Sequence, residues 1–307
     1  MISFELTFSG ILLGTLLPVY LALFLTSLIG KRISSNQRMR YFTAIGLGIL
    51  LFFFIDVTLD STELGVNSGL SGGLAQGGLL LSFAAGALVL TITDYYLCSS
   101  AASLKGELGT SSTSGLQGEF SKSSSRAVMF LIPALIALGL GIHGAGEGSS
   151  FAYVAAFTNS TSLIDAFGGY GPIISYVSHK FLEATVIGTA YFAYVIFGER
   201  NSTEQTTGLQ ASLRRQLFEL LTLGFLIWIP TILGTAIGYF LPVDPIYFYA
   251  FASGATIYSI LRLASPTLGP VFESNNGSLF SRTNVLVLIL ILIGFFLLYF
   301  AALLHST

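Results

Sequence analysis

The sequence predicts an all-α integral membrane protein with eight transmembrane helices. Of its 307 residues, 53 % are hydrophobic and only 9 % are charged, and the mean hydropathy is +0.80. This composition is typical of chains embedded in a bilayer rather than of soluble domains. An open chain in lipid must satisfy its own backbone hydrogen bonds, so the apolar segments are expected to be helices. The expected spans are, in order, 7–30, 41–60, 78–98, 127–157, 172–198, 213–241, 246–264 and 284–304.

The basic residues predict how these spans are oriented. Twelve of the thirteen Lys and Arg residues lie in or beside the connections between spans one and two, three and four, five and six, and seven and eight. The opposite connections hold none. Because cytoplasmic loops carry the excess of Lys and Arg, we expect a multi-pass protein of the cell membrane with both termini outside the cytoplasm. The thirteenth basic residue, Lys180, lies within span five.

Two polar segments divide the spans into groups of three, two and three. Residues 99–126 are rich in Ser, Gly and Thr, so a flexible cytoplasmic loop is expected there. Residues 199–212 are expected to be a second cytoplasmic linker. The chain is therefore expected to consist of 1–98 with helices one to three, 127–198 with helices four and five, and 213–307 with helices six to eight.

Spans two and seven share a pattern in which small residues are followed by bulky ones. The pattern runs from Ala44 through Gly48 in span two and from Ala250 through Gly254 in span seven. These spans cross the membrane in opposite directions, as an inverted repeat requires. The similarity therefore favours an inverted repeat of helices one to three and six to eight around helices four and five.

Spans four and five each carry a His four residues before a Glu: His143 and Glu147, then His179 and Glu183. Four residues are a little over one helical turn, so each pair lies on one face of its helix. Two imidazoles and two carboxylates from antiparallel neighbours would bind a divalent metal at mid-membrane. The alternative is a structural polar network in which Lys180 pairs with a nearby Glu. The metal hypothesis requires that the imidazoles converge and that no lysine ammonium fills the site.

Other acidic residues suggest an entrance and an exit for a cation. Asp56 and Asp60 lie four residues apart at the outer end of span two, while Asp94 and Glu219 lie near the inner ends of spans three and six. Carboxylates at each mouth would attract a cation. The simpler interpretation of Asp60 and Asp94 is an interfacial group or a contact at a helix end.

The sequence also argues against several other classes of protein. It has no basic tract and no zinc-finger spacing, so nucleic acid is not expected as a partner. The single Cys98 excludes an internal disulfide and a cysteine-based metal site. Neither a Ser/His/Asp set nor a His-Glu-x-x-His spacing indicates an enzyme. An intramembrane metallohydrolase that uses metal-bound water remains an alternative.

The chain resembles the ZIP (Zrt/Irt-like) family of divalent-metal transporters. The motifs that carry the resemblance are His143-Gly-Ala-Gly-Glu147-Gly148, His179-Lys180-Phe-Leu-Glu183-Ala184, Phe251-Ala-Ser-Gly254 and the segment from Pro230 to Gly238. They are similar to the family's signatures in helices four, five, seven and six. The resemblance implies eight helices in a 3+2+3 arrangement with both ends outside. It implies transport of a metal toward the cytoplasm, with zinc as the first candidate and iron or manganese as alternatives.

The chain also departs from the family pattern. The signature prolines of helices four and five are absent, and Gly144 replaces an Asn of the family signature. Lys180 stands at the equivalent position of helix five, where a cation would repel a second metal. Ile229 stands where a Glu often precedes the helix-six proline, and Asp56 and Asp60 stand where His and Glu are common. These departures favour a single metal. They leave open a non-transporting subunit or scaffold, as a homodimer or in a larger membrane complex.

Overall fold

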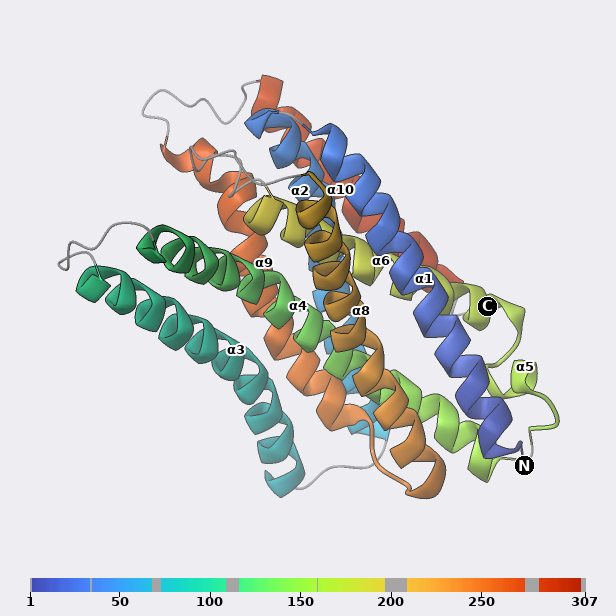
Figure 1. Cartoon of the computed structure of the whole chain (residues 1–307). Helices are drawn as coiled ribbons and strands as arrows, with labels where there is room; N and C mark the ends of the chain where they lie inside the picture. Colours follow the sequence, from blue (N-terminus) through green and yellow to red (C-terminus); the bar gives the residue numbers. More distant parts are fainter. Residues whose placement is uncertain are drawn as a thin grey trace.

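The computed structural model describes residues 2–33, 35–67, 73–108, 116–158, 160–196, 209–273 and 282–304. These residues form a bundle of long helices without a strand among them (Figure 1). The long helices are α1 (Phe4–Arg32), α2 (Asn36–Asn67), α3 (Gly73–Leu108), α4 (Leu116–Phe157), α6 (Tyr170–Tyr191), α8 (Leu209–Phe240), α9 (Ile246–Glu273) and α10 (Arg282–Leu303). A short helix, α5 (Leu163–Ala166), precedes α6, and a π-helical turn (Phe192–Ile196) follows it.

Six helices of the described chain, namely α1, α2, α3, α4, α8 and α10, are long and apolar enough to cross a membrane. The protein is therefore an all-α, multi-pass membrane protein. The expected spans five and seven coincide with α6 and α9, which are also long but carry more polar side chains. These side chains point inward: Lys180 and Glu183 of α6 are buried, as is Thr256 of α9.

The helices extend further than the sequence suggested. Helix α3 continues to Leu108 and α4 begins at Leu116, so helical backbone replaces much of the flexible loop expected over 99–126. Ala101, Ala102 and Leu104 favour this extension because Ala and Leu are strong helix formers. Residues 109–115 of that loop, and most of the expected linker at 199–212, lie outside the described residues.

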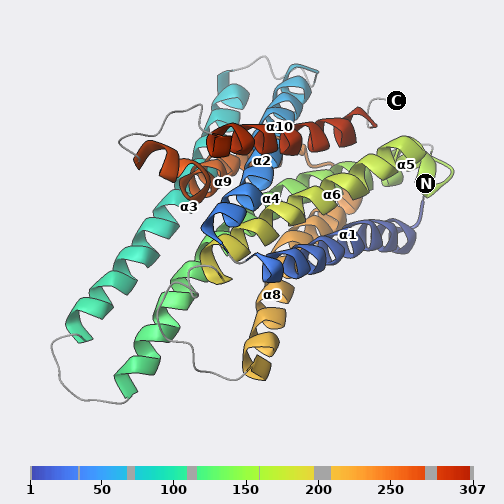
Figure 2. The same cartoon turned by 90° about the horizontal axis from the view of Figure 1, so that it is seen from above.

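Both ends of the chain lie at the same end of the bundle (Figures 1 and 2). The Ile2 amide donates to the Ala155 carbonyl at the end of α4, and the Tyr239 hydroxyl at the end of α8 donates to the Ile2 carbonyl. Near the start of α6, the Ser175 hydroxyl donates to the Ala301 carbonyl at the end of α10. We call this the terminal end. The side of the membrane that it faces remains a prediction.

The opposite end of the bundle is called the basic end, and it holds Arg40, Arg126, Arg215 and Arg262. Arg40 donates to the Thr267 carbonyl, which joins the start of α2 to α9. Arg126 and Arg215 both donate to one carboxylate of α8. The alternating direction of the helices therefore gathers these four arginines at one end, although the sequence places them on separate connections.

Helices α4 and α6 contact each other near the centre of the bundle (Figure 2). Helix α4 packs along α8 and against α9, while α6 packs against α1, α2 and α10. In this arrangement the His and Glu residues of α4 and α6 face a common interior. The core around them is apolar and includes the fully buried Ile136, Ile187 and Leu223.

Glycines allow some helix pairs to touch through their backbones. A Cβ on Gly86 of α3 would overlap the Phe251 carbonyl of α9, and a Cβ on Gly254 of α9 would overlap a carbonyl of α3. Helices α2 and α10 make the same reciprocal contact through Gly48 and Gly294. Close approach at small residues is a common source of stability between helices in membranes, where lipid is as apolar as the protein surface.

We expect Gly86→Ala to destabilise the fold by about 1–3 kcal/mol, because α3 and α9 must separate to admit the methyl group. The matched control is Gly77→Ala in the same helix, where open space surrounds the new Cβ. It should be neutral or stabilising by up to about 1 kcal/mol. Thermal unfolding of both variants in detergent measures the difference. Equal melting temperatures would contradict the backbone contact.

Candidate metal centre

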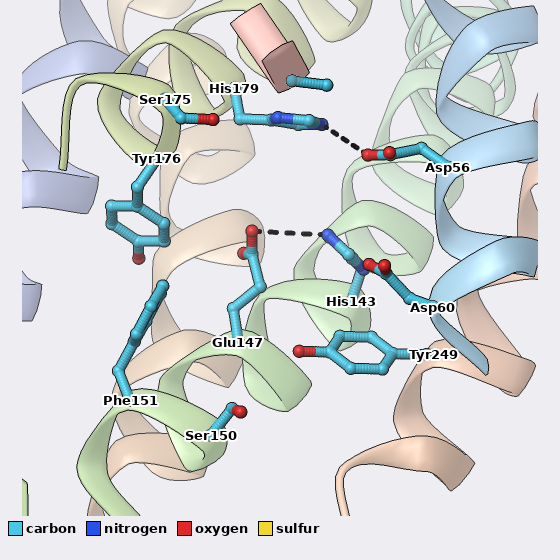
Figure 3. Close-up of a pocket in the computed structure, with 11 residues that line it drawn as sticks. Asp56, Asp60, His143, Glu147, Ser150, Phe151, Ser175, Tyr176, His179 and Tyr249 are labelled. Atoms are coloured by element: carbon cyan, nitrogen blue, oxygen red, sulfur yellow. Dashed lines mark ion pairs between the residues drawn. The ribbon is translucent and has the colours of Figure 1, made fainter. Parts of the chain in front are cut away.

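The polar side chains of α4 and α6 line a cavity of about 240 Å³ in the bundle (Figure 3). Residues from α2, α9 and α10 complete its walls. The lining residues are Asp56, Asp60, His143, Glu147, Ser150, Phe151, Ser175, Tyr176, His179, Tyr249 and Ala302. The cavity thus gathers side chains that are far apart in the sequence, and two of the chain's three histidines are among them.

Three of the four predicted ligands come together beside this cavity. His143 Nε2 lies 3.4 Å from Glu147 Oε1 and 3.9 Å from Glu183 Oε1. One ligand atom from each of the three residues lies within 4.8 Å of the others. Ligand atoms around a tetrahedral zinc ion lie roughly 3.4 Å apart. The His143 and Glu147 atoms are already at that separation, so a modest inward shift of Glu183 would complete a three-ligand site.

The fourth predicted ligand, His179, is directed elsewhere. Its Nε2 lies 3.3 Å from Asp56 Oδ2 of α2 (Figure 3), and it is outside the three-residue group. The Phe53 ring packs against both imidazoles, with ring centroids 4.8 Å from His143 and 6.3 Å from His179. The four-ligand arrangement expected from the sequence is therefore not the one that the structure shows. The neighbouring α2 supplies His179 with another carboxylate.

The Lys180 ammonium is a second departure from the expected site: it fills the position that the four-ligand metal hypothesis required to be free of a lysine, as the structural alternative expected. It contacts Glu147 of α4 and donates to both carboxylate oxygens of Glu183, at 3.1 and 3.0 Å. Its side chain is fully buried. Positions 179 and 180 lie four and three residues before Glu183, so both flank the same helix face. His179 pairs with Asp56, and the lysine takes the place at Glu183 that was expected for the histidine.

Asp60 lines the terminal-end side of the cavity near His143 (Figure 3), and it is exposed. It is therefore positioned at the mouth, as the sequence suggested for an entrance. Two tyrosines that the sequence analysis did not consider also form the wall. Tyr176 is bonded through its hydroxyl to Thr15 at 2.7 Å, and the Tyr249 ring lies 5.3 Å from the His143 ring. Tyr176 precedes His179 by three residues, a spacing that would have placed it on the same helix face.

The carboxylate of Glu219, expected on an exit path, is held in a network at the basic end. Arg126 donates to its two oxygens at 2.9 and 2.7 Å, and the Tyr191 hydroxyl donates at 2.7 Å. Arg215 donates to it at 3.3 Å. The network joins α4, α6 and α8. The sequence places Arg126 and Arg215 at expected cytoplasmic connections, and spacing along the chain does not indicate their contacts with Glu219.

Asp94, the other expected exit carboxylate, is also paired. It is buried on α3 and accepts from the Arg262 guanidinium of α9. The carbonyl of Arg262 in turn accepts from the Tyr194 hydroxyl, in the π-helical turn after α6. Both expected exit residues thus link helices at the basic end. A cation leaving in that direction would have to displace an arginine.

Comparison of the chain with protein-family models found no match, and comparison with curated proteins found none either. The resemblance to the ZIP family therefore rests on the motifs quoted above.

We expect Glu219→Gln to destabilise the protein by about 3 kcal/mol, because it removes the negative partner of a buried arginine. The control is Arg215→Met, which removes a half-exposed partner of the same carboxylate and should cost less than about 1 kcal/mol. Thermal unfolding in detergent compares the two. If Arg215→Met lowers the melting temperature as much as Glu219→Gln does, the burial of the Arg126–Glu219 pair is not the cause of the destabilisation.

Proposed function

We propose that this chain is a membrane transporter that moves a divalent metal cation through the centre of the helix bundle, as a diverged relative of the ZIP family. The observation that carries the proposal is the buried group of His143, Glu147 and Glu183 within a multi-pass membrane protein. Ionisable side chains at membrane depth are costly and mark ion pathways. Zinc is the first candidate because it binds imidazole and carboxylate ligands. Iron and manganese are alternatives for the same ligand types.

Two features of the cavity support a path from the terminal end to this group. Asp60 is exposed at its mouth, and Asp56 lies further in, beside His179. Carboxylates at an opening concentrate cations from solution. On the proposed orientation, with the terminal end outside and the basic end in the cytoplasm, the metal enters past Asp60. It reaches His143 and leaves when the Arg126–Glu219 and Arg262–Asp94 pairs part.

The pairing of the helices supports the proposed 3+2+3 inverted repeat of eight spans. Helix α2 packs against α10 as α9 packs against α3, and α1 packs against α6 as α8 packs against α4. Gly48 and Gly254, which occupy matching positions in the internal similarity, make the matching backbone contacts. Sites at the interface of inverted repeats are common in secondary transporters, whose halves rock around the bound ion. Here α4 and α6 would be that interface.

A non-transporting membrane subunit or scaffold is the second candidate, and Lys180 is the observation that favours it. The lysine already neutralises charge on Glu147 and Glu183, so a purely structural network would hold α4 and α6 together without a metal. Such a protein would purify without bound metal and in a fixed ratio with a partner. Elemental analysis of the purified protein, together with its subunit composition, separates the two candidates.

We expect His143→Ala to lower zinc uptake into proteoliposomes at least about tenfold, because it removes the nitrogen of the three-ligand group. Glu183→Gln should have a similar effect. His179→Ala should have a smaller one, since His179 pairs with Asp56 outside that group. The control is His305→Ala, which removes the third histidine, two residues before the last residue of the sequence and outside the described residues. Wild-type uptake in both His143→Ala and His179→Ala would refute the assignment.

A further inference from the structure

The Lys180 ammonium and a bound metal would need the same oxygen atoms. Lys180 contacts Glu147 and donates to both oxygens of Glu183, and these carboxylates are two of the three groups in the candidate metal centre. The lysine therefore does more than lie next to the metal position. It holds the ligands themselves, and a metal ion bound to them would exclude the ammonium.

Residues from three helices surround the Lys180 ammonium. A Cβ added at Gly144 of α4 would lie 3.4 Å from Nζ and would overlap the Thr231 hydroxyl of α8, so a side chain at 144 would crowd this corner. The Tyr176 ring of α6 lies 5.7 Å from Nζ, within the range of a cation–π contact. The fully buried Lys180 thus sits in a shaped site, and Gly144 is part of that shape.

Charge balance makes the two cations alternatives. With Glu147 and Glu183 ionised, the ammonium leaves one net negative charge. A divalent ion added beside it would leave one net positive charge, whereas a divalent ion in its place would leave none. Uncompensated charge is strongly disfavoured in a buried, low-dielectric site. The arrangement in which the two carboxylates are neutralised therefore contains the metal, with the Lys180 side chain turned away from them and its charge held elsewhere.

We propose that Lys180 is a built-in competitor of the transported metal: its ammonium occupies the carboxylates of Glu147 and Glu183 in the empty protein and must leave them before a divalent cation binds. This inference rests on the function proposed above. It makes Lys180 a determinant of affinity and selectivity. A weakly bound cation does not displace the ammonium, and the empty site never leaves two buried carboxylates unpaired.

The test is zinc binding to the purified protein in detergent, measured by calorimetry for the wild type, Lys180→Met and Lys180→Gln. Both variants should bind zinc at least roughly 100-fold more tightly, because zinc binding to the wild type must first break the buried ion pairs of the ammonium. The Gln side chain can still donate to a carboxylate, which protects folding. The control is Lys31→Met, the same change at an exposed position of α1, and it should bind as the wild type does.

Melting temperatures with and without zinc provide a second measurement. Zinc should raise the melting temperature of the Lys180 variants more than that of the wild type, and a variant that folds only with zinc also supports the inference. If the wild type and the folded variants bind zinc equally well, the inference is overturned while the proposed function stands. If none of the folded proteins binds zinc, the proposed function is refuted and the inference with it.

Discussion

A lysine side chain that has no access to water is the constraint on which the centre of this protein depends. Lys180 is fully buried in the bundle, and its ammonium contacts the carboxylates of Glu147 of α4 and Glu183 of its own helix. A buried cation with one partner removed is strongly destabilising, so α4 and α6 must meet at the depth where these groups face one another. A Cβ at position 144 would overlap the Thr231 hydroxyl and would contact the ammonium, so the glycine leaves space beside Lys180. The position of the candidate ligands follows from this arrangement.

Buried charges are also paired at the basic end of the bundle. Arg126 and Glu219 join α4 to α8, and Arg262 and Asp94 join α9 to α3. Each buried carboxylate in these pairs is held by an arginine from another helix, which fixes how the helices meet. Among the described residues, these ionic groups therefore form separate clusters, one at the candidate metal centre and two at the basic end. Apolar side chains such as Ile136 and Ile187 pack in the core around them.

Much of this architecture could be predicted from the sequence because it depends on short-range features such as apolar length, charge distribution and residue spacing. Apolar length predicted helices, and the alternation of basic residues predicted the gathering of the arginines at one end. The four-residue spacing of His143 and Glu147 predicted a shared helix face, and these side chains do lie 3.4 Å apart. The choice of partners could not be predicted in the same way. On α6, positions 179 and 180 are equally placed to reach Glu183, and the outcome depends on Asp56 of another helix. Which of several ionic residues pair is decided by the packing of distant segments, and spacing along one helix does not contain that information.

The glycine contacts determine which pairs of helices can move relative to each other. Helices α3 and α9 are in backbone contact at Gly86 and Gly254, and α2 and α10 are in backbone contact at Gly48 and Gly294. Neither helix of such a pair can slide along the other without a steric clash. Helices α4 and α8 also touch in this way through Gly141 and other glycines. In each of these pairs the two backbones are in direct contact. Between α4 and α6, by contrast, the boundary consists of long side chains that can change rotamer, and the lysine and its carboxylates lie there. This boundary of side chains coincides with the candidate metal centre, so a movement of α4 relative to α6 would change the distances between the candidate ligands.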